Sequence, residues 1–367
     1  MKIMENQIQN RTMMCMQCGM CTSLCPEAGI TPLNIRKLIR KKQLGRKTDE
    51  AAYWYCTSCG DCLLRCPRDV KPMEFLIELK SSLVEQGKIP ISMQKALENS
   101  FVHKNPWGRP KSKRADWTNE LDFQIPHISE TESKRLLFSC CIMAYDPRCM
   151  VIPVNIAKIF RKAGLEFGIL GVEEVCCGNE IRRMGEAGLF EELQEENRKS
   201  FQKYGVKEII ALSPHCMNAL KKEYDEPGIR VMHYTEVIAD MIDQKSLVFN
   251  NPYNKKVIYH DPCFLGKQNK IFEAPRRILR AIEGVELKEF SASKENSLCC
   301  EGGGGRMFYE AENTYQRNSE KRTGEALRKG ADILATSCPF CLMTLEDSAK
   351  EIDMPVKELS EIIIEAL

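Results

Sequence analysis

The sequence has no long apolar segment, little charge imbalance and few aromatic residues. No apolar run approaches the roughly 18 residues that a membrane-spanning helix needs, and the first ten residues, MKIMENQIQN, lack the apolar core of a secretory signal. Lys and Arg total 53 against 51 Asp and Glu, and aromatic residues make up 7%, which does not favour nucleic-acid binding. We therefore expect a soluble, cytoplasmic protein with no direct membrane span and no nucleic-acid partner.

Cysteine is the residue present in excess, at 19 of 367 residues. Disulfide scaffolds are typically short and secreted, and neither description suits this chain. All but Cys140 and Cys149 fall into groups that recur along the chain. Metal ligation therefore explains the cysteines better than disulfide bonding.

The N-terminal third contains one cysteine run twice, with the spacing C-x2-C-x2-C-x3-C-P. The first run is Cys15, Cys18, Cys21 and Cys25, and the second is Cys56, Cys59, Cys62 and Cys66. In two-cluster ferredoxins, such a run binds one [4Fe-4S] cluster through three cysteines, while its fourth cysteine ligates the other cluster. We expect the ligand sets Cys15, Cys18, Cys21, Cys66 and Cys56, Cys59, Cys62, Cys25. Zinc is the alternative, but zinc sites use cysteine pairs.

A helix is expected between the two runs, beginning near Thr31 and Pro32. Its apolar residues at helical spacing are Ile35, Leu38, Ile39 and Leu44. Its basic residues are Arg36, Lys37, Arg40, Lys41, Lys42, Arg46 and Lys47. They could dock an acidic electron donor or form an ordinary solvated helix face. We expect residues 1–85 to form one helical domain and residues 86–134 to form a connector with a helix or two.

The remaining two thirds read as a duplication. Cys141, the pair Cys176 and Cys177, and Cys216 each recur 122 to 125 residues later, as Cys263, the pair Cys299 and Cys300, and Cys341. The β-like runs KRLLFSCC, VKEIIALSPHC, KKVIYHDPC and GADILATSCPFC all end at cysteines, and helices are expected after Cys216 and Cys341. Ligands bind at the carboxyl ends of parallel strands. We expect two α/β modules around a cleft: the first module, residues 135–250, and the second module, residues 251–367.

The second module also carries a family resemblance. Cys263, then Cys299-Cys300-Glu301-Gly302, then Cys338-Pro339-Phe340-Cys341 resembles the CCG domain of the B-type and D-type chains of heterodisulfide reductase. With a helical ferredoxin module before it, the chain resembles the fused D-type chain over nearly its whole length. Related arrangements occur in iron–sulfur subunits of glycolate, lactate and anaerobic glycerol-3-phosphate dehydrogenases. The resemblance implies an α+β multidomain fold, with an α-helical ferredoxin-like domain for two [4Fe-4S] clusters followed by two α/β CCG modules.

The resemblance also implies a noncubane [4Fe-4S] cluster at which a disulfide is cleaved or formed. Its ligands in the second module would be Cys263, Cys299, Cys300, Cys338 and Cys341. The first module has Ser213 at the position of Cys338, which leaves Cys141, Cys176, Cys177 and Cys216. Those four could hold a cubane cluster, a zinc ion or an incomplete noncubane cluster, or stand empty. We expect Cys140 to pack rather than ligate, and Cys149 to be a small buried hydrophobe.

The catalytic candidates of the second module are Cys299, Cys300 and His260. His260, with Asp261, could deliver protons to a departing thiolate or be a strand-end histidine bonded to backbone. In the first module, His215 could replace the ligand lost at Ser213 or point to solvent.

The cofactor-binding candidates are Gly302, Gly303 and Arg306. The glycines would let the backbone approach the cluster. Arg306 could hold an anionic substrate or make an ordinary structural pair.

Two functions remain open. The chain could be a heterodisulfide reductase-type oxidoreductase component that passes electrons from two [4Fe-4S] clusters to the noncubane cluster for disulfide or thiol chemistry. It could instead be an electron-transfer subunit that links a flavin dehydrogenase or flavoprotein to a quinone-reducing or other acceptor. No flavin or nicotinamide fingerprint is present, so the partners would be other redox subunits, including a membrane quinone- or cytochrome-type subunit at the cytoplasmic face. Oxygen-sensitive clusters suggest anaerobic metabolism.

Overall fold

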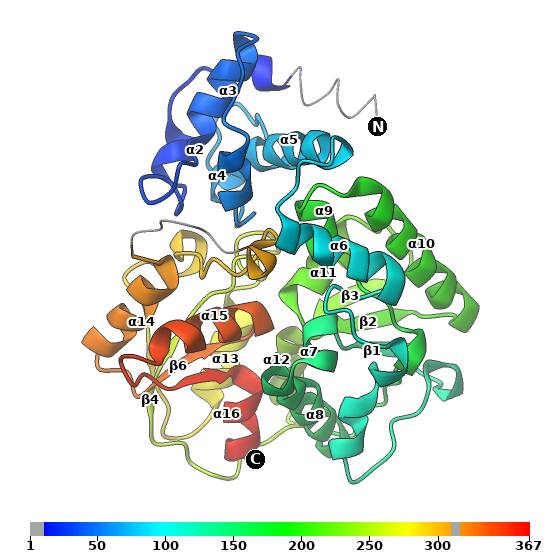
Figure 1. Cartoon of the computed structure of the whole chain (residues 1–367). Coiled ribbons are helices and arrows are strands. Elements are labelled where there is room, and N and C mark those ends of the chain that lie inside the picture. The colour runs from blue at the N-terminus through cyan, green and yellow to red at the C-terminus, as the bar shows by residue number, and fades with distance from the viewer. Residues whose placement is uncertain (1–10, 310–315) are drawn as a thin grey trace.

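The protein, described by a computed structural model over residues 11–309 and 316–367, has three parts. Figure 1 shows the N-terminal helices at the top, the first module at the right in green and the second module at the left in yellow to red. No helix among the described residues is long and apolar enough to cross a membrane.

The N-terminal part is helical, as predicted. Its elements are α2 (Met20–Ser23), α3 (Ile35–Gln43), the 3-10 helix η1 (Ala51–Tyr55), α4 (Asp61–Leu64) and α5 (Pro72–Glu85). The predicted helix between the cysteine runs is confirmed as α3, but it begins after Asn34 because the Asn34 side chain caps the backbone N–H of Lys37 at 3.0 Å. Ile35, Leu38 and Ile39 are buried, whereas Leu44 lies beyond the helix end and is exposed.

A connector leads to the first module. It contains α6 (Ile91–His103) and the short 3-10 helices η2 (Lys111–Lys113), η3 (Asp116–Glu120) and η4 (Ile128–Glu130). Trp117 in η3 is 1% exposed, so the connector is anchored by packing rather than running freely over the surface.

The first module is a three-stranded parallel sheet of β1 (Arg135–Phe138), β2 (Glu208–Ala211) and β3 (Arg230–His233), in that order. Its helices are α7 (Cys141–Tyr145), α8 (Pro147–Lys162), α9 (Asn179–Arg183), α10 (Ala187–Tyr204), α11 (Pro214–Lys222) and α12 (Tyr234–Asp243), with the 3-10 helix η5 (Gly171–Glu173). The interior of β2 is almost continuously apolar because helices cover both faces of a parallel sheet.

The second module repeats this plan around four parallel strands in the order β5-β4-β6-β7. The strands are β4 (Lys256–Tyr259), β5 (Glu286–Lys288), β6 (Ile333–Thr336) and β7 (Val356–Glu358). The helices are α13 (Glu273–Ala281), α14 (Asn318–Arg328), α15 (Pro339–Ala349) and α16 (Leu359–Ala366), with the 3-10 helices η6 (Lys294–Asn296) and η7 (Arg306–Phe308). The four β-like runs of the sequence are therefore strands β1, β2, β4 and β6.

The duplication is visible in the topology. Strands β1, β2 and β3 match β4, β6 and β7, and an isolated parallel bridge between Leu136 and Gly168 stands where the second module has β5. The modules contact each other through α8 with α16 and through α12 with α13. By chain order α8 is equivalent to α13, and α12 is equivalent to α16. Exchanging the two modules therefore turns one contact into the other, so the modules are related by an approximate twofold axis.

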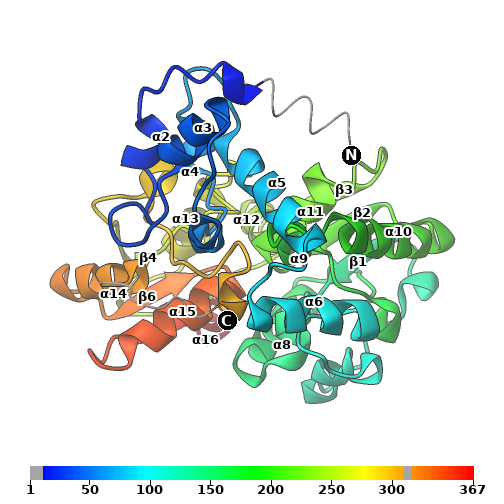
Figure 2. The ribbon, with the colours of Figure 1, turned by 45° about the horizontal axis from the view of Figure 1, so that its top comes forward.

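The predicted cleft between the modules is filled. His215 stacks on Phe340 with ring centroids 4.3 Å apart and lies 4.2 Å from the ring of Phe264. His215 and Phe340 occupy equivalent places in the two modules. The N-terminal helices cover this region from above, and Figure 2, with the top of the molecule turned forward, shows them in front of the two modules.

Candidate functional site

The two N-terminal cysteine runs adopt the same local structure. Gln17 and Ser58, each two residues after the first cysteine of its run, have φ of 59° and 53°. Gly19 and Gly60 have φ of 86° and 88° and precede α2 and α4. Left-handed residues turn backbone N–H groups to one side, which is the arrangement that anionic cluster sulfurs require.

The fourth cysteine of each run lies beside cysteines of the other run. Burial, followed by the neighbouring Cys59 and Cys56 thiols, raises the pKa of Cys25 well above its ordinary value. Burial raises the pKa of Cys21 too, and Cys66 is among the thiols that add to this rise. These neighbours fit two clusters that share ligands between the runs.

The five predicted thiols of the second module form one connected chain of contacts. Cys263 is hydrogen-bonded to Cys299, Cys299 to Cys300, and Cys341 to Cys338, while the Cys300 and Cys341 sulfurs lie 3.2 Å apart. Hydrogen bonds from Cys299 and Cys341 lower the pKa of the central thiol, Cys300, well below its ordinary value. A thiolate is the form that binds metal, so this set fits an iron–sulfur cluster.

His260 lies next to these thiols. One ring nitrogen of His260 and the Cys300 and Cys341 sulfurs all lie within 4.8 Å of one another. Nδ1 of His260 accepts a hydrogen bond of 3.4 Å from Arg322, and burial, followed by the Arg322 charge, lowers the pKa of His260 well below its ordinary value. His260 is therefore held beside two proposed cluster ligands, and proton delivery by this residue stays a prediction.

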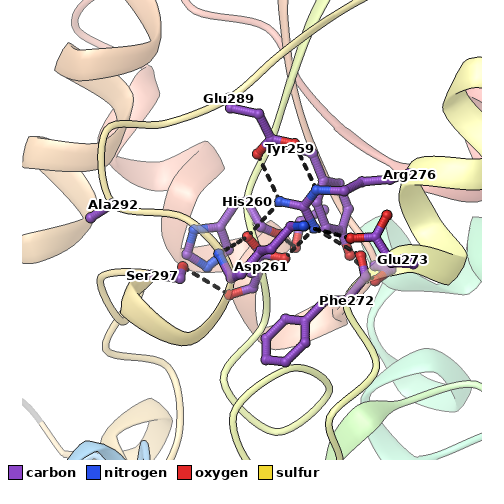
Figure 3. A network of polar contacts seen from close by, with 12 residues as sticks. Tyr259, His260, Asp261, Phe272, Glu273, Arg276, Glu289, Ala292 and Ser297 are labelled. Carbon is purple, nitrogen blue, oxygen red and sulfur yellow. Dashed lines mark hydrogen bonds and ion pairs between the residues drawn. The ribbon is translucent and has the colours of Figure 1, made fainter.

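Asp261 is fixed in a separate ion pair. Arg276 donates to its two carboxylate oxygens at 2.6 and 2.9 Å and reaches Glu289 with the same guanidinium. Figure 3 shows Arg276 between Asp261 and Glu289, beside Tyr259. Asp261 also accepts the backbone N–H of Lys294 at 2.8 Å, so its role is to hold the loop after β4 rather than to move protons with His260.

The glycine loop after Cys300 contacts the N-terminal domain. A Cβ added at Gly304 would lie 2.4 Å from the Cys56 carbonyl oxygen, and one at Gly303 would lie 2.9 Å from the Thr57 carbonyl oxygen. The nearest neighbour of Gly302 is the Phe340 backbone. The glycines thus allow the second ferredoxin run to approach the second module, a role the sequence alone did not indicate.

Arg306 ends this loop and lies over aromatic rings rather than over the thiols. Its guanidinium carbon is 5.5 Å from the centroid of the Tyr55 ring and 5.7 Å from that of Tyr309. Burial, followed by the nearby Glu301, raises the pKa of the buried Glu27 carboxyl to about 7. The positive charge of Arg306 opposes this rise.

The second ferredoxin run touches the second module through sulfur. The hydrogen bond with Cys299, together with burial, raises the pKa of Cys59, and the Cys299 sulfur lies 3.6 Å from the Thr57 hydroxyl. Lys267 sits beside both thiols and pairs with Asp61 at 2.6 Å. This junction places the proposed ligands of two clusters in direct contact.

Lys80 joins all three parts of the protein. Its ammonium group donates to the carbonyl oxygens of Arg183 and Gly304 at 3.2 Å and of Cys56 at 3.5 Å. Lys80 is 1% exposed. Three carbonyl acceptors match the three N–H donors of an ammonium ion, so a buried cation lies beside the second ferredoxin run.

The first module also gathers its predicted cysteines. Cys141 is hydrogen-bonded to Cys176, and Cys177 to both Cys176 and Cys216. These hydrogen bonds lower the pKa of Cys177 to about 7, which repeats the pattern at Cys300. Ser213 is instead the N-cap of α11 and accepts the backbone N–H of His215 at 3.3 Å.

His215 belongs to the first module but faces the second. Its Nδ1 is 2.7 Å from the Glu180 carboxylate, and Glu180 and Cys338 raise the pKa of His215 although burial opposes the rise. His215 therefore neither points to solvent nor joins the thiols of the first module. It makes a hydrogen bond to Cys338, a proposed ligand of the second module.

A basic groove lies beside the first ferredoxin run. Cys18 is exposed there. The charged residues that line the groove are Arg36, Lys37, Arg40, Lys41 and Arg46. Four basic residues of α3, together with Arg46 after it, thus line the groove beside the exposed Cys18.

Comparison with known proteins places the chain in a class. The 4Fe-4S dicluster domain family matches residues 14–70, and the Cysteine-rich domain family matches residues 136–221 and 257–346. The chain is therefore an iron–sulfur protein with one dicluster domain and two cysteine-rich domains, which confirms the α+β multidomain fold class.

The chain is related more particularly to the D-type chain of heterodisulfide reductase, as its motifs predicted. It is 29% identical to the D chain of the dihydromethanophenazine:CoB–CoM heterodisulfide reductase from Methanosarcina barkeri over 393 residues, covering 96% of this chain and 93% of that protein. It is also 35% identical to the EtfAB:quinone oxidoreductase of Syntrophomonas wolfei and 36% identical to the probable iron–sulfur-binding oxidoreductase FadF of Bacillus subtilis. The matches to these two cover 86% of this chain but only 46% of each relative.

Several residues of the site are not identified by the sequence interpretation. Lys80 and Lys267 are single lysines in ordinary surroundings, and only the fold brings them to the cysteine runs. Cys140 is expected from the sequence to be a packing residue, although its position directly before Cys141 is a signal that could draw attention to it.

Proposed function

We propose that the chain is an electron-transfer subunit in which electrons move between a partner, the two ferredoxin clusters and a noncubane [4Fe-4S] cluster in the second module. The clusters, when bound, supply one-electron carriers. The two ferredoxin clusters would use the ligand sets Cys15, Cys18, Cys21, Cys66 and Cys25, Cys56, Cys59, Cys62. The noncubane cluster would use Cys263, Cys299, Cys300, Cys338 and Cys341.

The contact between Cys59 and Cys299 carries this proposal. Each thiol belongs to a different ligand set, and the glycine loop presses the backbone around Thr57 against the second module. Lys80 and Lys267 place positive charge at the same junction. Buried cations stabilise the more negative, reduced state of a cluster, so this junction favours reduction next to the second module.

The basic groove is the surface where we propose that the redox partner docks and exchanges electrons with the first ferredoxin cluster. It surrounds exposed Cys18 with positive side chains, whereas the thiols of the second module are all nearly inaccessible, with Cys263 the most exposed at 6%. An acidic redox protein would be steered to the groove. The similarity to an EtfAB:quinone oxidoreductase favours a flavoprotein on one side of the path and a quinone-reducing or cytochrome-type acceptor on the other.

Disulfide chemistry in the second module is the second candidate. The close group of His260, Cys300 and Cys341 and the similarity to the D chain of a heterodisulfide reductase favour it. Cleavage of a disulfide consumes two electrons and two protons and releases two thiols. The nearly inaccessible thiols leave a substrate little room to approach through the described residues, so the relay is the better-supported function.

One experiment separates the two functions. The full chain is purified anaerobically. Electron paramagnetic resonance spectra of the reduced protein, and of the oxidised protein with and without a small thiol, are recorded for wild type and Cys300→Ser. The relay predicts cubane signals on reduction and no change on adding thiol. A thiol-dependent signal in wild type that disappears in Cys300→Ser would instead establish sulfur chemistry at the second module and overturn the pure relay.

A further inference from the structure

The first module contains a backbone conformation that its residue does not favour. Cys140 lies between β1 and α7 with φ 72° and ψ 147°. Glycine occupies this region freely, whereas a residue with a Cβ atom incurs a cost of roughly 1–3 kcal/mol there. Residues in such conformations cluster at functional sites, where the side chain is needed. A cysteine at this position, where glycine would be free of strain, therefore indicates that the side chain of Cys140 has a function.

The side chain of Cys140 supplies such a reason. The thiol is 5% exposed, and it forms a hydrogen bond with Cys216, which also bonds Cys177. Cys140 therefore lies against the thiols of the first module, within the buried interior of the protein. It is not an isolated cysteine, because it extends a set that already includes four others.

The contacts of the first module follow the same order as those of the second. In the second module, the chain of sulfur contacts runs Cys263, Cys299, Cys300, Cys341, Cys338. In the first module it runs Cys141, Cys176, Cys177, Cys216, Cys140. The first four members are equivalent by duplication. Cys140 is therefore at the end of the chain where the second module has Cys338.

The residue equivalent to Cys338 in sequence has a different task. Ser213 uses its hydroxyl group as the N-cap of α11 and is fully buried. The first module thus has no sulfur at position 213. The thiol at the corresponding end of its chain of contacts belongs to Cys140, in the segment after β1.

A buried cation completes the first-module site. Arg114 is 2% exposed, and its Nη1 lies 3.0 Å from the Cys141 sulfur, while its Nη2 pairs with Glu174. Glu174 is held in turn by the Ser139 backbone and hydroxyl at 3.0 and 2.9 Å. Charged groups at this depth are retained where they meet a charged partner, and thiolate ligands of a cluster provide one.

We propose that the first module holds an iron–sulfur cluster of its own and that Cys140 is the fifth thiolate ligand, in place of the cysteine absent at position 213. The ligand set is Cys140, Cys141, Cys176, Cys177 and Cys216. A zinc ion takes four ligands in structural sites and would leave one of these five thiolates without a metal. The site lies outside the electron path proposed above, and its presence does not depend on that path.

The test uses Cys140→Gly in the full chain. Glycine accepts φ 72° without strain, so the variant should unfold, as apo-protein, at the same temperature as wild type or higher. After identical anaerobic reconstitution, it should contain about four fewer iron and about four fewer sulfide per chain, as expected for one lost [4Fe-4S] centre, and lack one component of the Mössbauer spectrum. The double variant Cys140→Gly with Ser213→Cys should regain that component, because a thiol returns at the position equivalent to Cys338.

Cys149→Ser is the matched control. Cys149 is fully buried and lies close to Cys140. It is on α8, the second helix after Cys140, and is outside the chain of sulfur contacts. It should keep the iron and sulfide content of wild type. Retention of all iron, sulfide and spectral components in Cys140→Gly would overturn the proposal, as would zinc rather than iron in the first module of wild type. These readouts require no electron-transfer activity, so they distinguish a failure of this site from a failure of the relay.

Discussion

Three buried basic side chains lie close to cysteines that we assign to clusters: Lys80, Lys267 and Arg114. Each is held by specific partners, three carbonyl oxygens for Lys80 and a carboxylate for each of the others. Placing a cation in a dry interior is costly unless it is paired. Their positions therefore indicate that the surroundings are negatively charged in the working protein.

Lys80→Met should make the second ferredoxin cluster harder to reduce. Removal of the positive charge beside Cys56 should lower its reduction potential by roughly 60 mV, a tenfold change in a one-electron equilibrium. A redox titration followed by electron paramagnetic resonance measures this shift. Lys95→Met, which removes an exposed lysine on α6, should leave the potential unchanged. Equal potentials in wild type and Lys80→Met would show that Lys80 does not act on the cluster.

Glu358 gives the interface between the modules a dependence on pH. The Tyr234 hydroxyl of the first module donates to it, and burial raises the pKa of Glu358 from 4.5 to about 7. Between these values the folded protein binds more protons than the unfolded chain, so stability falls as the pH rises through this window.

Glu358→Gln should remove this contribution while keeping a hydrogen-bond acceptor. The wild type should lose up to about 3 kcal/mol of unfolding free energy from this group as the pH rises through the window, and the variant should show a correspondingly flatter profile. The free energy of unfolding, measured by chemical denaturation at about pH 5 and pH 8, tests this expectation, because most of the range between the two pKa values lies between these pH values. Glu351→Gln, at an exposed position, should retain the wild-type slope. Parallel profiles for wild type and Glu358→Gln would contradict the assignment.

At the scale of elements, the glycine loop and α3 occupy the two ends of the proposed path. The loop, residues 302–305, contacts the second ferredoxin run, and α3 borders the groove beside the first. The sequence predicted α3 and its apolar face because helical periodicity is a local property. It did not predict what the loop contacts, because that contact joins segments far apart in the chain.

Gly304→Ala should separate the second ferredoxin run from the second module. Its Cβ would meet the Cys56 carbonyl oxygen at 2.4 Å, and such overpacking costs about 1–3 kcal/mol. Gly330→Ala is the control, since Gly330 also has a positive φ, 65°, but has no atom within 4 Å of the added Cβ. Freeze-quench spectra after rapid reduction should show slower reduction of the second module in Gly304→Ala only. Identical rates in the two variants would rule out the loop as a constraint on the path.

Charge reversal on α3 should weaken the partner side of the path. The double variant Arg40→Glu with Lys41→Glu should raise the KM for an acidic donor protein, most strongly at low ionic strength, because attraction across a groove is screened by salt. Lys158→Glu with Lys162→Glu, on α8 of the first module, provides a control with the same change in charge. An unchanged KM in the α3 variant would show that its basic residues do not bind the donor and form only a solvated helix face.

At the scale of the whole molecule, the cysteines determine which features could be predicted. Their spacing indicated the dicluster domain, the duplication and the second-module ligand set, because cluster ligation imposes short, repeated intervals. Ser213 indicated that the first module departs from the second. The role that we propose for Cys140 could not be predicted, since this thiol comes from a different segment than position 213. The filled space around His215, Phe264 and Phe340 also escaped prediction, because it depends on how the two modules pack.

The most direct test of the proposed path is the magnetic interaction between the second ferredoxin cluster and the second-module cluster in the reduced full chain. With Cys59 and Cys299 in contact, pulsed electron paramagnetic resonance should show strong spin–spin coupling between the two centres. Cys299→Ser should abolish this coupling while both ferredoxin signals remain. Uncoupled spectra, or a second module without iron in protein whose ferredoxin sites are full, would contradict the electron path.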